Sequence, residues 1–162
     1  MKYSKEKLFW KIEAKEKCFF LEEYDETKDY YSFVKDMIDK KCHQIAITSD
    51  IMLDYIERIA SIGNIYVDKI EMMEEDDELI QTIGELVSRC SSNRGNFVEL
   101  VKRLRYLDEE SSVDIKRVYL HEEKEGKQIL GYIQVNGIVG ISEYNSCMVD
   151  ALLQCVRECL SE

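Results

Sequence analysis

Residues 113–141, VDIKRVYLHEEKEGKQILGYIQVNGIVGI, contain three runs rich in β-branched and apolar residues, separated by two glycine-containing turns. Short runs of this kind, bounded by turn signals, are typical of β-strands. Asn136-Gly137 stands between the last two runs and favours a two-residue type I′ turn, in which both central residues need positive φ. The segment therefore predicts an antiparallel three-stranded meander that ends near Ile141 and turns at Asn136-Gly137.

The residues before and after this meander show further strand and helix patterns. Apolar residues alternate over 8–14, and an aromatic run over 18–24 follows after a short link, so an antiparallel hairpin is expected there. The strand–helix–strand unit that follows leaves room for parallel pairing, because its helix is long enough for a crossover. Further strands are expected over residues 44–48 and 65–72, and helices over 27–41, from an N-cap at Ser49 to Gly63, and over 75–90, 96–107 and 142–160.

This order of elements predicts one α+β domain with a mixed, mainly antiparallel sheet packed with about five helices. The sheet should contain an N-terminal strand pair and a C-terminal three-strand meander. A chain of 162 residues can bury one core, and the absence of proline and of any glycine-rich tract gives no sign of a linker. A single domain over 1–162 is therefore expected, with a division into 1–111 and 112–162 as the second choice.

Composition restricts the class of protein and its partners. Apolar residues make up 45% and aromatic residues 10%, which is far from the composition of disordered chains. The net charge of -11 repels phosphate backbones, so direct nucleic-acid binding is not expected. No apolar run is long enough to cross a membrane, and the N-terminus lacks the pattern of a signal peptide. Six cysteines without that pattern favour reduced thiols and a cytoplasmic location.

Motifs that would identify a chemistry are missing from the chain. The two histidines, His43 and His121, form no helical ligand pair, and Cys42 beside His43 would point to the opposite face of a strand. Cys155 and Cys159 share a helical stripe that resembles a core face. Neither a glycine-rich phosphate loop nor a nucleophile elbow is present. The sequence therefore assigns no catalytic residue, metal or cofactor, and it argues against an enzyme without excluding one.

Two concentrations of charge remain. Acids at the start of an expected helix favour its positive end, but they could also dock on a basic partner or imitate phosphates. The basic residues could pair with surrounding acids or hold a phosphate or carboxylate, and Arg94 should precede a helix N-terminus, which favours anions. The acidic candidates are Glu71, Glu74, Glu75, Asp76, Asp77 and Glu78, and the anion-binding candidates are Arg89, Arg94, Lys102 and Arg105.

These features lead us to expect a non-enzymatic, acidic, cytoplasmic protein-interaction module, such as a regulatory, adaptor or inhibitor subunit. One alternative is a small enzyme or ligand-binding domain that holds a phosphate or carboxylate at residues 89–105. Another alternative is an acidic mimic of nucleic acid that inhibits a DNA-binding enzyme. The expected partner is a protein, not nucleic acid and not a membrane.

A twofold homodimer is a further expectation for a chain of this size. Two surfaces could form it: the terminal helix and the aromatic strand. The terminal helix carries Cys147, Met148, Leu152, Cys155 and Cys159, and the strand carries Cys18, Phe19 and Phe20. If Leu152 belongs to the core, the helix cannot be the dimer surface.

Overall fold

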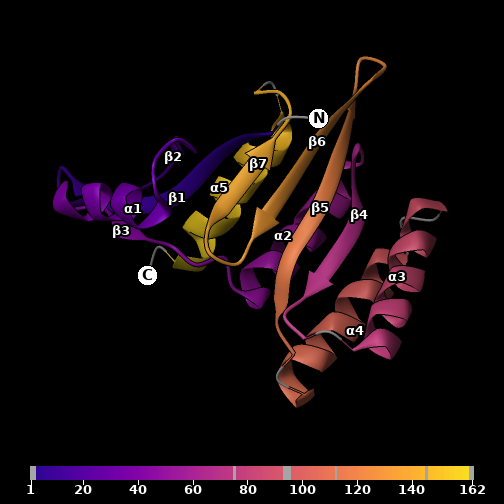
Figure 1. Ribbon diagram of the computed structural model, residues 1–162. Helices are drawn as coiled ribbons and strands as arrows, with labels where there is room; N and C mark the ends of the chain where they lie inside the picture. Colours follow the sequence, from indigo (N-terminus) through magenta and orange to yellow (C-terminus); the bar gives the residue numbers. More distant parts are fainter. Residues whose placement is uncertain (1–2, 75, 93–95, 112, 145, 161–162) are drawn as a thin grey trace.

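The computed structural model describes residues 3–74, 76–92, 96–111, 113–144 and 146–160, which form seven strands and five helices (Figure 1). The strands are β1 (Ser4–Glu13), β2 (Glu16–Glu23), β3 (His43–Gln44), β4 (Ile65–Met72), β5 (Ile115–Lys124), β6 (Lys127–Gln134) and β7 (Ile138–Ile141). The helices are α1 (Tyr30–Asp39), α2 (Ser49–Ile62), α3 (Asp77–Ser92), α4 (Asn96–Ser111) and α5 (Cys147–Leu160).

All seven strands belong to one open sheet. Its order is β2-β1-β7-β6-β5-β4, and the short β3 pairs with β1. Each pairing is antiparallel. The α+β prediction, with an N-terminal hairpin and a C-terminal meander, is therefore confirmed.

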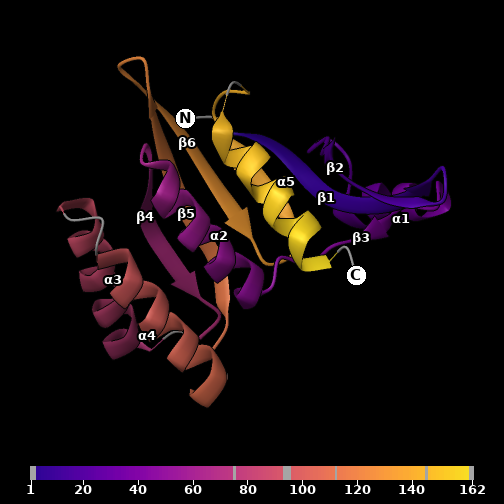
Figure 2. The same ribbon diagram turned by 180° about the vertical axis from the view of Figure 1, so that it is seen from behind.

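One face of the sheet is covered by helices α2 to α5. Figures 1 and 2 show α2 and α5 side by side behind the strands, with the α3–α4 hairpin next to α2 at the β4 side. Helix α1 packs instead at the β1–β2 end, where Phe33 and Val34 of α1 and Phe9 of β1 form a small separate cluster. The strands from β4 to β7 consequently have helices on one face only.

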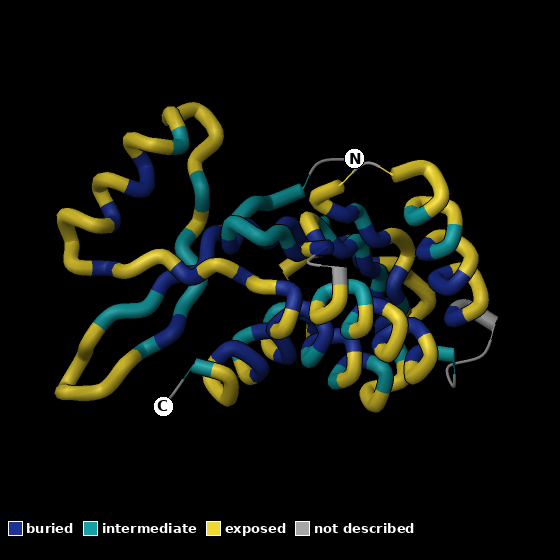
Figure 3. Tube along the Cα trace, turned by 90° about the horizontal axis from the view of Figure 1, so that it is seen from below, coloured by how far each residue is buried: buried dark blue, intermediate teal, exposed yellow. Residues whose placement is uncertain are grey.

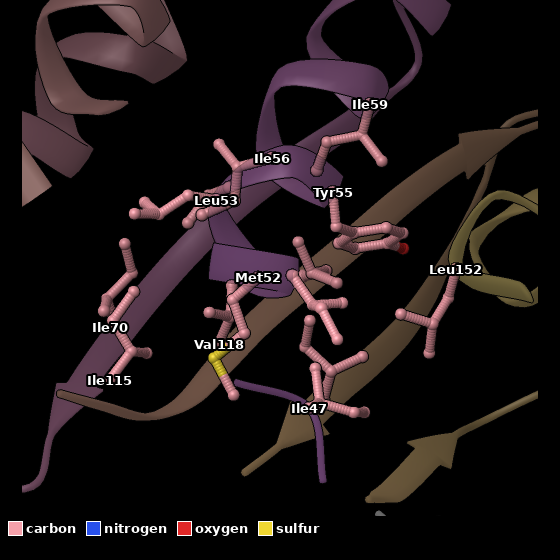
Figure 4. Packing of buried hydrophobic residues seen from close by; sticks show 14 of the residues in the cluster. Ile47, Met52, Leu53, Tyr55, Ile56, Ile59, Ile70, Ile115, Val118 and Leu152 are labelled. Atoms are coloured by element: carbon pink, nitrogen blue, oxygen red, sulfur yellow. The ribbon is translucent and has the colours of Figure 1, made fainter. Parts of the chain in front are cut away.

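The main core lies between α2 and the sheet (Figure 4). Met52, Tyr55, Ile56 and Ile59, the stripe expected on this helix, are all fully buried. Leu152 of α5 is also 0% exposed and belongs to the same cluster. The apolar band of the terminal helix is therefore core around Leu152, which removes that residue from any dimer surface.

The turns differ from the sequence-based expectation. In the β6–β7 turn only Gly137 has a positive φ, of 87°, among the three turn residues, and its N–H donates to the Gln134 carbonyl. The type I′ prediction for Asn136-Gly137 is therefore wrong, and the turn is a three-residue loop with glycine in the left-handed region. The β1–β2 turn instead has positive φ at both Ala14 and Lys15.

The stretch expected to form a strand over 44–48 pairs as β3 only at His43 and Gln44. Ile45 and Ile47 are buried, but their N–H groups donate to single carbonyls of two different strands. The parallel strand–helix–strand unit does not form, because β3 lies beside β1 whereas β4 is at the opposite edge of the sheet. Thr48, one residue earlier than expected, caps α2, and Gly63 closes this helix with a φ of 98°.

Candidate functional site

The face of β4 to β7 opposite α2–α5, together with the start of β1, is here called the open face. Alternation along the strands sends every second side chain to this face. It collects tyrosines and cations, but carboxylates of β4 lie among them: Glu71 is the cross-strand partner of Arg117, and Asp68 lies 2.7 Å from His121. Its members include Tyr3, Lys5 and Lys7 near β1, Tyr66 and Lys69 on β4, Arg117, Tyr119 and His121 on β5, and Tyr132 and Gln134 on β6.

Arg117 is at the centre of this layer. Its guanidinium carbon lies 4.6 Å from the Tyr132 ring centroid and 5.5 Å from that of Tyr119, so both rings contact the cation. Tyr3 packs edge-on against Tyr132, with the centroids 5.1 Å apart, and Lys69 lies over Tyr119. The aromatic rings therefore hold the arginine side chain in one place.

A hydrogen-bonded chain runs from Arg117 to the β6–β7 turn. The guanidinium donates to the Tyr119 hydroxyl at 2.8 Å and to the Gln134 side-chain oxygen. The Gln134 amide donates to the side-chain oxygen of Asn136 at 2.9 Å, and the Lys7 amine donates to the Asn136 carbonyl. Two cations are thus joined through two neutral amides, and neither cation forms an ion pair with a carboxylate of the described residues.

Lys7 is unusual for a lysine, because it is only 1% exposed. Its amine lies 5.7 Å from the Phe9 ring centroid and 5.6 Å from that of Tyr30. Burial lowers the pKa of Lys7 from 10.5 to about 8, since the charged form loses its water. The turn above it requires glycine at Gly137, where a Cβ would clash with the Ile45 carbonyl oxygen.

Lys5 adds a third cation, and this one has a partner. Its amine pairs with Glu26, in the segment between β2 and α1, and that hydrogen bond raises the pKa of Lys5. Tyr132 lies across Gly140, where a Cβ would clash with the ring. Burial raises the pKa of Tyr132, and the nearby Lys5 and Arg117 partly oppose that rise. The site can therefore bind and orient an anion or a carbonyl, but it holds no nucleophile paired with a base.

The described basic residues expected from the sequence line two neighbouring grooves. Arg89 and Lys102 line a groove between α3 and α4 with a volume of about 700 Å3, together with Arg103. Lys102 also lines a second groove with Arg105, which forms ion pairs with Asp54 at 2.8 Å and Glu57 at 3.2 Å on α2. The predicted Arg94 lies outside the described residues.

The acidic residues expected from the sequence are divided as well. Glu71 is on β4, 3.7 Å from Lys69. The Asp76 carboxylate caps α3 by accepting hydrogen bonds from the N–H groups of Glu78 at 2.9 Å and Leu79 at 3.3 Å. Asp77 and Glu78 occupy the first turn of α3, Glu74 is exposed, and Glu75 lies outside the described residues. Helix capping thus accounts for part of this charge.

The six cysteines are free, and Cys42, Cys90 and Cys155 are buried. Cys159 is exposed at the end of α5, where desolvation and the nearby Asp54 carboxylate raise the pKa of its thiol to about 12. Across the described parts of the chain, no group of three potential ligands is arranged to hold a metal ion. Nor does any described helix combine the length and apolar character needed to span a membrane.

Comparison with known proteins found no matching family model, no similar curated protein and no similar solved structure. Any functional proposal for this chain therefore rests on its geometry alone.

The open face was missed in the sequence, although its spacing left a signal. Arg117, Tyr119 and His121 stand two apart, as do Tyr132 and Gln134. The same alternation that predicts the strands therefore also predicts that these side chains share faces. What the sequence did not show is which strands would be neighbours, and that the face bearing these side chains would have no helix over it.

Proposed function

We propose that the protein is a non-enzymatic, cytoplasmic interaction module that binds an acidic segment of another protein on its open face. The observation that carries the proposal is the position of Arg117, against two tyrosine rings and without an ion pair to a described carboxylate. Arginine and tyrosine are the residues most enriched at the centres of protein interfaces. Six free cysteines fit the reducing compartment that the proposal names.

Electrostatics supports an acidic partner segment rather than a basic one. The whole chain is strongly acidic, so an acidic partner would be repelled everywhere except where cations are concentrated. On the open face Lys5 and Lys7 are on β1 and Arg117 is on β5, with β7 and β6 between them, and of these three cations only Lys5 pairs with a described carboxylate. Repulsion elsewhere and attraction here would favour docking on the open face over the acidic parts of the surface.

Nuclear magnetic resonance titration with a synthetic peptide rich in glutamate and tyrosine tests this proposal. The expected shifts are in β5, β6 and the start of β1, and binding should weaken with added salt. Arg117→Gln should weaken binding about tenfold, since a charge-assisted hydrogen bond contributes about 1.5–3 kcal/mol. Lys127→Gln, an equal change of charge at the exposed start of β6, should have little effect. Shifts confined to the helices, or equal binding of a lysine-rich peptide, would contradict the proposal.

A second candidate function is supported by the groove between α3 and α4. Arg89, Lys102 and Arg103 line it together with Glu85 and Tyr106. This geometry supports the binding of a small phosphate or carboxylate compound by two or three cations. A thermal-shift assay with inorganic pyrophosphate separates the two sites. Stabilisation that is lost in Lys102→Ala and kept in Arg117→Gln would favour the groove, and no stabilisation at all would dismiss it.

A further inference from the structure

Among the described strands, the outer edge of β2 is an unpaired strand edge, and the protection it carries is charge, since four of its eight residues are charged: Glu16, Lys17, Glu22 and Glu23. β2 is the last strand at its end of the sheet and pairs with β1 over all eight of its residues, without a bulge. The opposite edge strand, β4, differs, because its pairing with β5 contains register shifts at two places. Bulges are one of the devices that keep sheet edges from pairing with other chains. β2 lacks that device and also lacks proline.

The direction of the backbone groups along β2 follows from the pairing with β1. The Tyr24 N–H donates to the Lys5 carbonyl, so this pair is a hydrogen-bonded one. In an antiparallel pair such positions alternate, so every even-numbered residue of β2 bonds to β1. The N–H and C=O groups of Lys17, Phe19, Leu21 and Glu23 therefore point away from the sheet. No backbone partner for them lies within the described part of the chain.

This parity restricts how a second β2 could pair with the first around a twofold axis. Residues whose backbone N–H and C=O groups point outward must be opposite residues of the second copy whose groups also point outward. These are the odd-numbered residues, so the numbers of two opposite residues add up to an even number. The twofold axis therefore passes beside one residue and not between two. An axis beside Phe20 places Lys17 of each copy opposite Glu23 of the other, which gives two equivalent pairs. It also places Phe19 opposite Leu21 and Phe20 opposite itself. The alternative axis beside Phe19 places Glu16 opposite Glu22, which is a repulsive pair.

The charges along β2 favour the first of these two registers. Glu6 of β1 is directly opposite Glu23 of β2. Its pKa is raised, mainly by burial and to a smaller extent by the negative charges of Glu23 and Glu22. Neither of those two glutamates forms an ion pair within the described residues. Lys17 likewise lacks an ion pair there, although its amine lies 4.8 Å from the Trp10 ring centroid. A second copy would bring its Lys17 to this cluster of glutamates.

We propose that β2 pairs antiparallel with β2 of a second copy, with the twofold axis beside Phe20, so that two sheets become one. The β1–β2 turn at one end of this edge is exposed (Figure 3). The docking of an acidic segment on the open face is a separate matter, because it uses a different surface.

Exchange of the two charges tests the pairing and its register together. Sedimentation equilibrium should give a dimer for the wild type. Lys17→Glu and Glu23→Lys should each raise the dimer dissociation constant about tenfold, because two attractive pairs become repulsive. The double variant Lys17→Glu/Glu23→Lys should recover the affinity. Lys127→Glu provides the matched control for net charge. A monomeric wild type, or a double variant as weak as the single ones, would overturn the proposal.

Cross-linking gives a second test that does not depend on charge. Phe20 and its symmetry mate would form a non-hydrogen-bonded pair, with Cα atoms about 4.5 Å apart, within the range of a disulfide. Cys18→Ser/Phe20→Cys should therefore yield a covalent dimer when oxidised, whereas Cys18→Ser alone should not. Circular dichroism establishes that both variants fold. A folded Cys18→Ser/Phe20→Cys protein that stays monomeric after oxidation would refute the register.

Discussion

Replacement of Lys7 by methionine tests the electrostatic description of the open face most directly. Methionine has nearly the same length and shape but cannot be protonated. The Lys7 amine is buried between two aromatic rings and a backbone carbonyl, without a carboxylate to balance it. The pH dependence of the free energy of unfolding should therefore differ between the wild type and Lys7→Met, and the difference reports the titration of this amine.

The sign and size of that difference follow from the pKa. Burial lowers the pKa of Lys7 from 10.5 to about 8. Between these values the unfolded chain binds more protons than the folded protein, so the free energy of unfolding rises with pH. At pH 7 the charged amine costs the folded state about 3 kcal/mol, and at pH 9.5 about 1 kcal/mol, because one pKa unit corresponds to about 1.4 kcal/mol.

Urea unfolding followed by circular dichroism at several pH values from 7 to 9.5 measures this effect. The free energy of unfolding of the wild type, minus that of Lys7→Met, should rise by about 2 kcal/mol across this range. Other groups that titrate in this range, such as the buried cysteines, occur in both proteins and cancel. Lys127→Met should show no such trend. A difference that stays constant from pH 7 to 9.5 would show that Lys7 is solvated in the folded protein.

Three further variants test the fold. Ala14→Asn with Lys15→Gly should raise the free energy of unfolding by about 1 kcal/mol, because both positions have positive φ in a two-residue turn; urea unfolding measures it. Gly137→Ala should lower that energy by about 2 kcal/mol or more, since the methyl group would clash with the Ile45 carbonyl at a φ of 87°. Leu152→Glu should unfold the protein rather than dissociate a dimer, as circular dichroism with light scattering would show, because Leu152 is in the core.

The sequence predicted the elements well where local signals marked their ends. β4 has the expected bounds, since Gly63 and Asn64 end the preceding helix and the acidic segment follows the strand. Prediction failed where long-range pairing decides the structure. Residues 44–48 have the composition of a strand. In the structure this segment runs from β1 to the end of β6 and forms only a few backbone hydrogen bonds with each of them.

The candidate sites show the same division between local and long-range information. Asp76, Asp77 and Glu78 lie at a helix start as expected, because capping depends on neighbours in sequence, whereas Glu71 is on β4. Arg105, in contrast, was grouped with Lys102, three residues away, although its ion pairs are with Asp54 and Glu57 on α2. Helical spacing of three suggests one face, but it does not reveal which neighbouring helix carries the opposite charge.

The cost of Lys7 provides the last step in favour of a binding role for the open face. A methionine at this position would fill the same space without a buried charge, and an isolated buried cation is unfavourable for stability. Departures from the most stable choice are expected where a protein binds or reacts. The charge of Lys7 is poorly screened, because it is surrounded by protein rather than by water and salt. Tyr30 of α1 covers Lys7 itself, so its charge, together with that of Arg117, would attract an acidic segment to the adjoining part of this face, over β4 to β7, that helices leave open.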